Sequence, residues 1–151
     1  MPSKPHRFHG ILHSARLLEQ VLEDRLAPTG VSPRQAHVLT AINELEPVSQ
    51  SCLAEAFEVK QASMSTMIDR LLAADFISRA PDPLERRRNV IGLTDKGRSK
   101  LDAIHKIWSE MDEHIQTLLG AADADSYFRL SAELRGALGG HPPGQRPRPV
   151  A

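Results

Sequence analysis

Apolar side chains recur at three- and four-residue steps along most of the chain, and this spacing predicts a mainly helical fold. The first run covers residues 8–22 and ends before Gly30. A second helix is expected from Ser32, whose hydroxyl can cap the free amides while Pro33 fits the first turn. Pro47 stops this second run. The chain therefore begins with a long amphipathic helix and a shorter one.

The next pattern is that of two short helices joined by a tight turn. Ser49 can cap the first of them, and the tripeptide Glu58-Val59-Lys60 separates it from the second. The inward positions of that second helix are Met64, Met67, Ile68, Leu71 and Leu72. Two short helices with such a turn predict a helix-turn-helix.

The period then changes from helical to alternating. Residues 76–79 and 89–93 are predicted as two short strands, with the charged segment DPLERRR between them as the loop of a hairpin. Thr94 can cap a long helix, and Asp123 is expected to open a last one that reaches Leu138. The long helix carries a heptad-like seam of Leu101, Ile104, Trp108, Met111, Ile115 and Leu118. This seam is longer than one small domain needs to cover itself.

Composition narrows the class of protein. A chain of 151 residues fits one compact domain, and its zero net charge conceals a basic segment. Residues 60–100 hold nine Lys or Arg against five Asp or Glu, whereas residues 101–135 hold three against seven. No signal peptide or membrane-spanning run is recognisable, and the single Cys52 supports no disulfide framework. We expect a cytoplasmic protein without membrane partners.

A family resemblance rests on several of these pieces together. The run LAEAFEVKQASMSTMIDRLLAADFISRAPDPLERRRNVIGLTDKG resembles the winged helix-turn-helix of the multiple antibiotic resistance regulator (MarR) family, and SPRQAHVL resembles the helix before it. The resemblance implies a homodimeric transcriptional regulator, here expected to be a repressor, that binds a palindromic operator on double-stranded DNA. The implied divisions are a dimerisation helix in 1–30, the winged domain in 31–98, dimerisation helices in 99–138 and a disordered tail in 139–151.

Three positions depart from the family pattern. Glu58 stands where the turn usually has Gly, and Lys60 stands where the recognition helix usually has a Ser or Thr cap. Asp75 replaces the usual Gly after that helix, although Asp tolerates left-handed geometry better than most residues. Lys60 adds a positive charge where a phosphate would lie close.

The recognition helix should present its outward face to base edges in the major groove. Gln61 is the best candidate to read a base, because its amide can pair with adenine. The expected DNA-contacting residues of this helix are Lys60, Gln61, Ala62, Ser63, Ser65, Thr66 and Arg70. The alternative is a polar surface helix without a partner, and the hairpin that follows favours DNA.

The three arginines of the hairpin loop should lie over the neighbouring minor groove, whose negative potential attracts Arg. By resemblance, Arg87 enters that groove and Glu85 orients it. Arg86 and Arg88 then contact phosphates or support the loop. Elsewhere such a run would be read as a solvated charge cluster, but the hairpin context favours DNA.

The resemblance also implies a small-molecule effector in a cleft between dimerisation helices and the winged domain. His13, Arg16, His37 and Trp108 are the candidate lining residues, with Arg16 holding an aromatic carboxylate or a histidine meeting a phenol. Alternatively, Arg16 pairs with Glu19 or Gln20, or points to water.

Other functions have weaker support in the sequence. His9 and His13 lie one helical turn apart, as metal ligands can, but no third ligand is evident; no cation lies near Cys52 in sequence to activate a sensing thiol. A thiol- or metal-sensing regulator and a protein-binding winged helix stay open as alternatives. No catalytic motif is present, so we expect neither an enzyme nor a cofactor.

Overall fold

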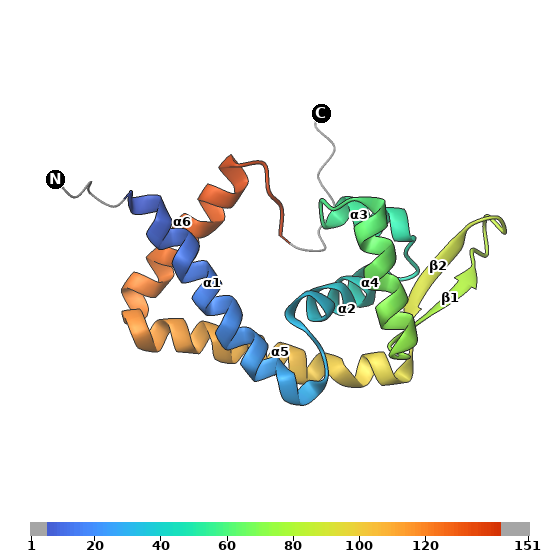
Figure 1. Cartoon of the computed structure of the whole chain (residues 1–151), viewed down its shortest axis with the longest axis horizontal. Helices are drawn as coiled ribbons and strands as arrows, with labels where there is room; N and C mark the ends of the chain where they lie inside the picture. Colours follow the sequence, from blue (N-terminus) through green and yellow to red (C-terminus); the bar gives the residue numbers. More distant parts are fainter. Residues whose placement is uncertain (1–5, 143–151) are drawn as a thin grey trace.

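A computed structural model describes residues 6–142 of the chain. In this part, four α-helices precede a single β-hairpin and two follow it (Figure 1). The elements are α1 (Arg7–Leu26), the 3₁₀ turn η1 (Ala27–Thr29), α2 (Pro33–Leu45), α3 (Gln50–Ala56), α4 (Gln61–Ala73), β1 (Ile77–Pro81), β2 (Asn89–Leu93), α5 (Asp95–Leu119) and α6 (Ala121–Ala137). The mainly helical fold with one hairpin is as predicted. Most of the expected tail, residues 143–151, lies outside the described part.

Three of the helix starts follow the caps read from the sequence. The Ser32 hydroxyl accepts a hydrogen bond from the Gln35 amide at 3.2 Å, and the Gln35 side chain returns one to the Ser32 amide at 3.0 Å. The Ser49 and Thr94 hydroxyls cap α3 and α5 with a single bond each, accepting the Cys52 amide at 3.2 Å and the Gly97 amide at 3.0 Å. These side chains satisfy amides that have no partner within the helix.

The last helix begins earlier than predicted. It starts at Ala121 rather than Asp123, because Gly120 turns the chain sharply with φ 83° and its carbonyl accepts the Ala124 amide at 2.9 Å. Asp123 lies instead in the first turn, where a carboxylate suits the helix dipole.

The core lies where α2, α3, α4, the hairpin and the first half of α5 meet. Its fully buried side chains include Leu39, Ile42, Leu53, Ile68, Leu71, Ile91 and Ile104. Along the seam of α5, Leu101 and Ile104 are buried, Trp108 is half-buried, and Leu118 is exposed. The winged half of the molecule thus has its own core, and the far half of α5 leaves it.

The two strands pair antiparallel, with Ile77 opposite Leu93 and Pro81 opposite Asn89. The first strand begins one residue later than predicted and runs to Pro81. Val48, between α2 and α3, adds a bridge to Ile91 through hydrogen bonds of 2.7 and 3.2 Å. This bridge anchors the hairpin to the helix-turn-helix.

The start of α5 is locked under the end of α4. The Thr94 amide donates to the Phe76 carbonyl at 3.1 Å, and the Thr94 hydroxyl donates to the Asp75 carbonyl at 2.6 Å. Gly97 passes so close that an added Cβ would lie 2.0 Å from the Phe76 oxygen. Only glycine fits this crossing.

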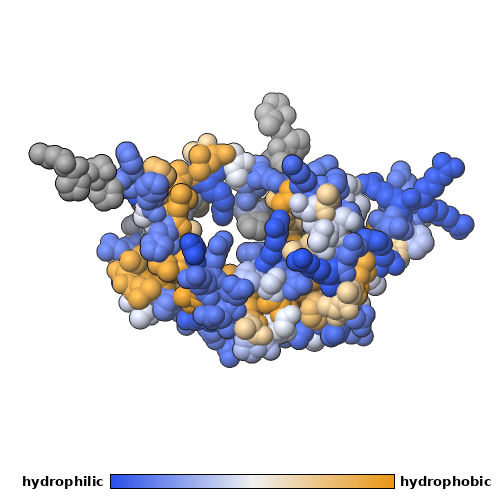
Figure 2. Space-filling model, viewed as in Figure 1, coloured by the Kyte–Doolittle hydropathy of each residue, from blue (hydrophilic) through white to orange (hydrophobic). Residues whose placement is uncertain are grey.

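The other half of the molecule is formed by α1, α6 and the end of α5, opposite the hairpin (Figure 1). Apolar side chains gather on this side in the space-filling view (Figure 2). Its exposed large apolar residues are Phe8, Ile11, Leu12, Leu17, Leu118, Leu119, Tyr127, Leu130, Leu134 and Leu138; we call them the terminal apolar surface. Among the described residues, no helix combines the length and apolar character that crossing a membrane requires.

Candidate nucleic-acid interface and effector cavity

The helix α4 has one buried face and one polar face. Met64, Met67, Ile68 and Leu71 are buried, as predicted. The residues expected to contact DNA lie on the other side: Lys60, Gln61, Ala62, Ser63, Thr66 and Arg70 are exposed, and Ser65 is half-buried. This face is polar and carries no large apolar side chain.

The turn before α4 accommodates the two unusual residues. Glu58 adopts a left-handed φ of 53°, and the Val59 amide donates to the Ala54 carbonyl at 3.0 Å to close α3. Lys60 provides no side-chain cap for α4. The first amides of α4 are therefore free of a side-chain cap and available to a phosphate, and the N-cap residue itself is a lysine.

Backbone hydrogen bonds fix the loop of the hairpin, residues 82–88, which we call the wing loop. The Asp82 amide donates to the Arg88 carbonyl at 2.7 Å, and the Arg88 amide donates to the Glu85 carbonyl at 2.8 Å. The Asp82 carboxylate accepts the Leu84 amide at 2.9 Å. The loop thus has a defined shape at its base and at its tip.

The three arginines of the wing loop divide into two groups. Arg88 turns back toward α3: its guanidinium donates to the Ser49 hydroxyl at 3.3 Å and lies 3.8 Å from the Glu85 carboxylate. All three arginines are exposed, but neither Arg86 nor Arg87 has an ion pair within residues 6–142. The loop brings the Glu85 carboxylate to Arg88, and the expected role of Glu85 in orienting Arg87 stays a prediction. Of the two roles considered for Arg88, support of the loop matches these contacts.

Two further polar links hold the hairpin, and sequence reasoning missed both. Arg79 of β1 donates to the Gln50 side chain of α3 at 3.2 Å and lies 4.0 Å from the Asp69 carboxylate of α4. These partners are far apart in sequence, and no local pattern indicates them.

The second link centres on the carboxylate of Glu46, at the end of α2. It accepts the Leu93 amide of β2 at 2.9 Å and pairs with Arg98 of α5. Arg98 also donates to the Asn43 side chain at 3.2 Å. One carboxylate therefore joins α2, the hairpin and α5.

A cavity of about 520 Å³ lies between α1, α2 and α5. Its lining is Ala15, Leu18, Glu19, Leu22, His37, Trp108, Met111 and Asp112. The His37 and Trp108 rings lie 4.9 Å apart between centroids, and burial lowers the pKa of His37 from its ordinary value. The Trp108 indole N–H is buried without an acceptor in the described structure. The cavity therefore has an aromatic wall, and the indole N–H of Trp108 is shielded from solvent.

Two of the four expected effector residues do not line this cavity. His13 and Arg16 are exposed, and Arg16 has no ion pair within residues 6–142. The face of α1 toward the cavity carries Ala15 and Leu22, and Arg16 is turned about 100° from Ala15. Among the alternatives for Arg16, a solvent-facing side chain matches this placement. The charged lining residues are instead the acidic Glu19 and Asp112.

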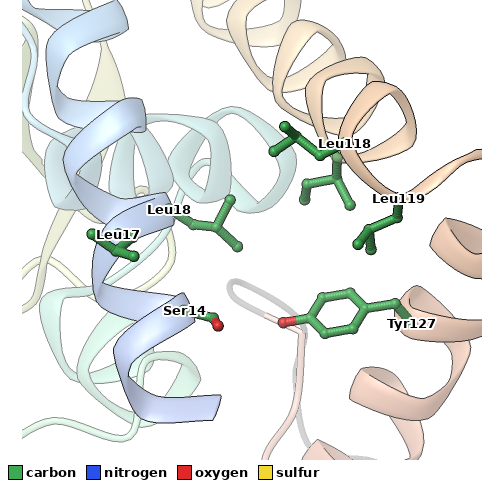
Figure 3. Close-up of a pocket in the computed structure, with 7 residues that line it drawn as sticks. Ser14, Leu17, Leu18, Leu118, Leu119 and Tyr127 are labelled. Carbon is green, nitrogen blue, oxygen red and sulfur yellow. The ribbon is translucent and has the colours of Figure 1, made fainter. Parts of the chain in front are cut away.

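A second, apolar cavity of about 250 Å³ lies between α1, α5 and α6. Figure 3 shows leucines from α1 and from the end of α5 around it, with the Tyr127 hydroxyl directed toward Ser14. It adjoins the terminal apolar surface and contains no charged side chain.

The alternative sensor sites gain no support from geometry. No group of three or more His, Cys, Asp or Glu in residues 6–142 is placed to hold a metal ion. His9 packs its ring on Phe8, 4.1 Å away between centroids, and Cys52 is half-buried on α3. The protein-binding alternative remains untested by these contacts.

Comparison with known proteins agrees with this architecture. The MarR family model matches residues 31–88. The chain is 32% identical over 122 residues to the HTH-type transcriptional repressor NicR of Pseudomonas putida, covering 81% of this chain and 74% of that protein. It is 26% identical over 145 residues to the multiple antibiotic resistance protein MarR of Escherichia coli, covering 91% and 99%.

The fold also matches solved structures. It superposes on the transcriptional repressor CouR bound to a 23-mer DNA duplex with a TM-score of 0.78, at 22% identity over 85% of this chain and 92% of that one. These relatives are transcriptional regulators and not enzymes. The chain described here belongs to the MarR family and is a winged helix-turn-helix transcriptional regulator.

Proposed function

We propose that this regulator is a repressor that binds a palindromic operator as a homodimer and leaves it when a small aromatic molecule occupies the His37–Trp108 cavity. The observation that carries the DNA-binding part is the division among the wing arginines. All three are exposed, but Arg88 contacts Ser49 of the α3 cap and Glu85, whereas Arg86 and Arg87 have no ion pair within residues 6–142. Two free guanidinium groups on a rigid hairpin suit a narrow minor groove.

In this proposal α4 enters the major groove while the wing loop lies over the adjacent minor groove. The Gln61 amide reads an adenine, and Arg70 with the hydroxyls of Ser63, Ser65 and Thr66 contacts bases or phosphates. Lys60 and the uncapped amides of α4 hold a phosphate. Arg87 enters the minor groove, and Arg86 contacts its phosphate walls.

The homodimer is supported by the terminal apolar surface. Large apolar side chains on α1, α5 and α6 are exposed, including Leu12 at 62% and Leu118 at 66%. A continuous apolar surface of this kind marks a protein contact. A second copy placed against it would cover these residues and set two recognition helices at a fixed separation, as a palindrome requires.

The effector proposal follows from the lining of the cavity. The aromatic rings of His37 and Trp108, both in the lining, can stack on a planar molecule. Arg16 supplies no anion anchor, while Glu19 and Asp112 would repel a carboxylate. Of the two effector classes expected from the resemblance, a neutral phenol therefore fits better than an aromatic acid.

The wing supplies the test of DNA binding. Arg87→Ala should weaken binding to a duplex selected by the protein from a randomised pool by about 1–3 kcal/mol. The slope of log affinity against log salt should fall by about one unit, because one phosphate-neutralising charge is lost. Fluorescence anisotropy at several salt concentrations measures both. Unchanged affinity at moderate salt would rule out the minor-groove role of Arg87.

The effector site can be tested with the fluorescence of Trp108, the single tryptophan of the chain. Titration with phenol and with benzoate should change the emission only for phenol, and the same concentrations should release the duplex. Release without any change at Trp108 would place the effector elsewhere.

A further inference from the structure

One exposed leucine lies apart from the terminal apolar surface. Leu84 is 94% exposed. Every other exposed large apolar residue in the described part belongs to α1, α5 or α6, or directly follows α6. Leu84 stands instead in the wing loop, two residues before Arg86. A dimer contact at the opposite end of the molecule does not account for it.

The backbone around Leu84 is held in place although its side chain touches little. The Leu84 amide donates to the Asp82 carboxylate at 2.9 Å, and Pro83 fixes the backbone angle just before it. The Asp82–Arg88 backbone bond of 2.7 Å closes the loop beneath. The leucine is thus presented in a defined position, and its side chain contributes nothing to the core.

An isobutyl group in water gains free energy when an apolar surface covers it. The walls of the DNA minor groove offer such a surface, because they are lined by deoxyribose carbons. Proteins that bind this groove often combine arginine with apolar side chains pressed against the sugars and base steps. Arg86 and Arg87 lie beside Leu84 in the same loop, so a groove that receives them also receives the leucine.

We propose that Leu84 enters the minor groove with the wing arginines and packs against its deoxyribose walls, adding an apolar contact to an otherwise electrostatic one. The inference rests on the proposed position of the wing loop in the groove. It assigns to this chain a DNA contact that carries no charge and so should not depend on salt.

The experiment compares two variants of similar volume, Leu84→Met and Leu84→Gln, on the selected duplex. Leu84→Gln should bind about tenfold more weakly, because a polar amide gains little against the sugars, whereas Leu84→Met should stay within about twofold of the parent. The salt slope should be the same for all three, because leucine displaces no counterion. Thermal unfolding should also be equal, since the side chain is exposed.

The outcomes separate this inference from the function it rests on. If Arg87→Ala weakens binding but Leu84→Gln does not, Leu84 makes no DNA contact and the inference falls, leaving a protein partner as the remaining occupant. A lower salt slope in Leu84→Gln would also overturn the inference. The substitution would then weaken binding by moving a wing arginine away from the DNA, not by removing an apolar contact. If Arg87→Ala and Leu84→Gln both bind like the parent, the wing loop does not occupy the groove, and the proposed function itself fails.

Discussion

Among single residues, the Arg88–Ser49 contact makes a distinct prediction. Arg88→Ala should weaken DNA binding by about 0.5–1.5 kcal/mol, the range of one hydrogen bond, because the hairpin loses its link to α3. The salt slope should stay at the parent value, since Arg88 faces α3 and not the phosphates. Anisotropy titrations of Arg88→Ala and Arg87→Ala, side by side, give the comparison.

Ser49 also caps α3, so its own substitution has two effects. A double-mutant cycle of Ser49→Ala with Arg88→Ala isolates the contact between them. Strictly additive losses in DNA affinity, or a salt slope in Arg88→Ala that falls like that of Arg87→Ala, would count against a supporting role.

The half-buried His37 predicts a pH dependence of stability. Burial lowers the pKa of His37, so near pH 6.5 the unfolded chain takes up a proton that the folded chain does not. Its contribution to stability is complete above the unfolded pKa and is lost as pH falls toward the folded pKa. Urea unfolding at pH 7.5 and 5.5 should show a larger loss for the parent than for His37→Gln. His13→Gln, at an exposed position, should behave like the parent.

At the scale of elements, substitution of the two turn residues with left-handed backbone angles should raise the stability of the fold. Glu58 and Asp75 have φ of 53° and 59°, where a Cβ is unfavourable. Glu58→Gly should stabilise the fold by up to about 1 kcal/mol, and Asp75→Gly by less, because Asp tolerates this region better. Glu58→Ala keeps the Cβ and should bring no gain. Chemical denaturation of the four proteins measures the differences, and equal stabilities for Glu58→Gly and Glu58→Ala would refute the strain.

The elements themselves were largely predictable, because their signals are local. Caps such as Ser32 and Thr94 act within three residues, and buried positions recur at fixed steps. The links that hold the hairpin were not predictable, since Glu46 and Leu93 are 47 residues apart and nothing in sequence pairs them.

The cavity was predictable in part. His37 and Trp108 do meet in it, as expected. The sequence did not show which face of α1 turns toward the cavity. Apolar residues occur around much of that helix, as Leu12 and Leu17 show, because it has both an inner face and an exposed apolar one. Periodicity alone could not decide on which face Arg16 lies.

At the scale of the whole molecule, the terminal apolar surface predicts assembly. The parent should sediment as a dimer at micromolar concentration, and the double variant Leu130→Asp with Leu134→Asp should be a monomer, because both side chains are exposed on α6 and charge would oppose their burial. Leu84→Asp, at the more exposed position in the wing loop, should remain a dimer. A parent that stays monomeric in this range, or a double variant that still pairs, would contradict the proposed interface.

The close passage of Gly97 beneath Phe76 has a mechanical consequence. Because it fixes the start of α5 to the end of α4 and to the hairpin, α5 acts as a lever whose far end lies among the terminal helices. Its 25 residues span about 37 Å. A tilt of about 5° at the far end would displace the recognition helix by about 3 Å, close to the rise of one base pair. In the proposed dimer, a slight change in the contact between the two copies would therefore alter the separation of the two recognition helices. That separation would then no longer match the distance between successive turns of the duplex.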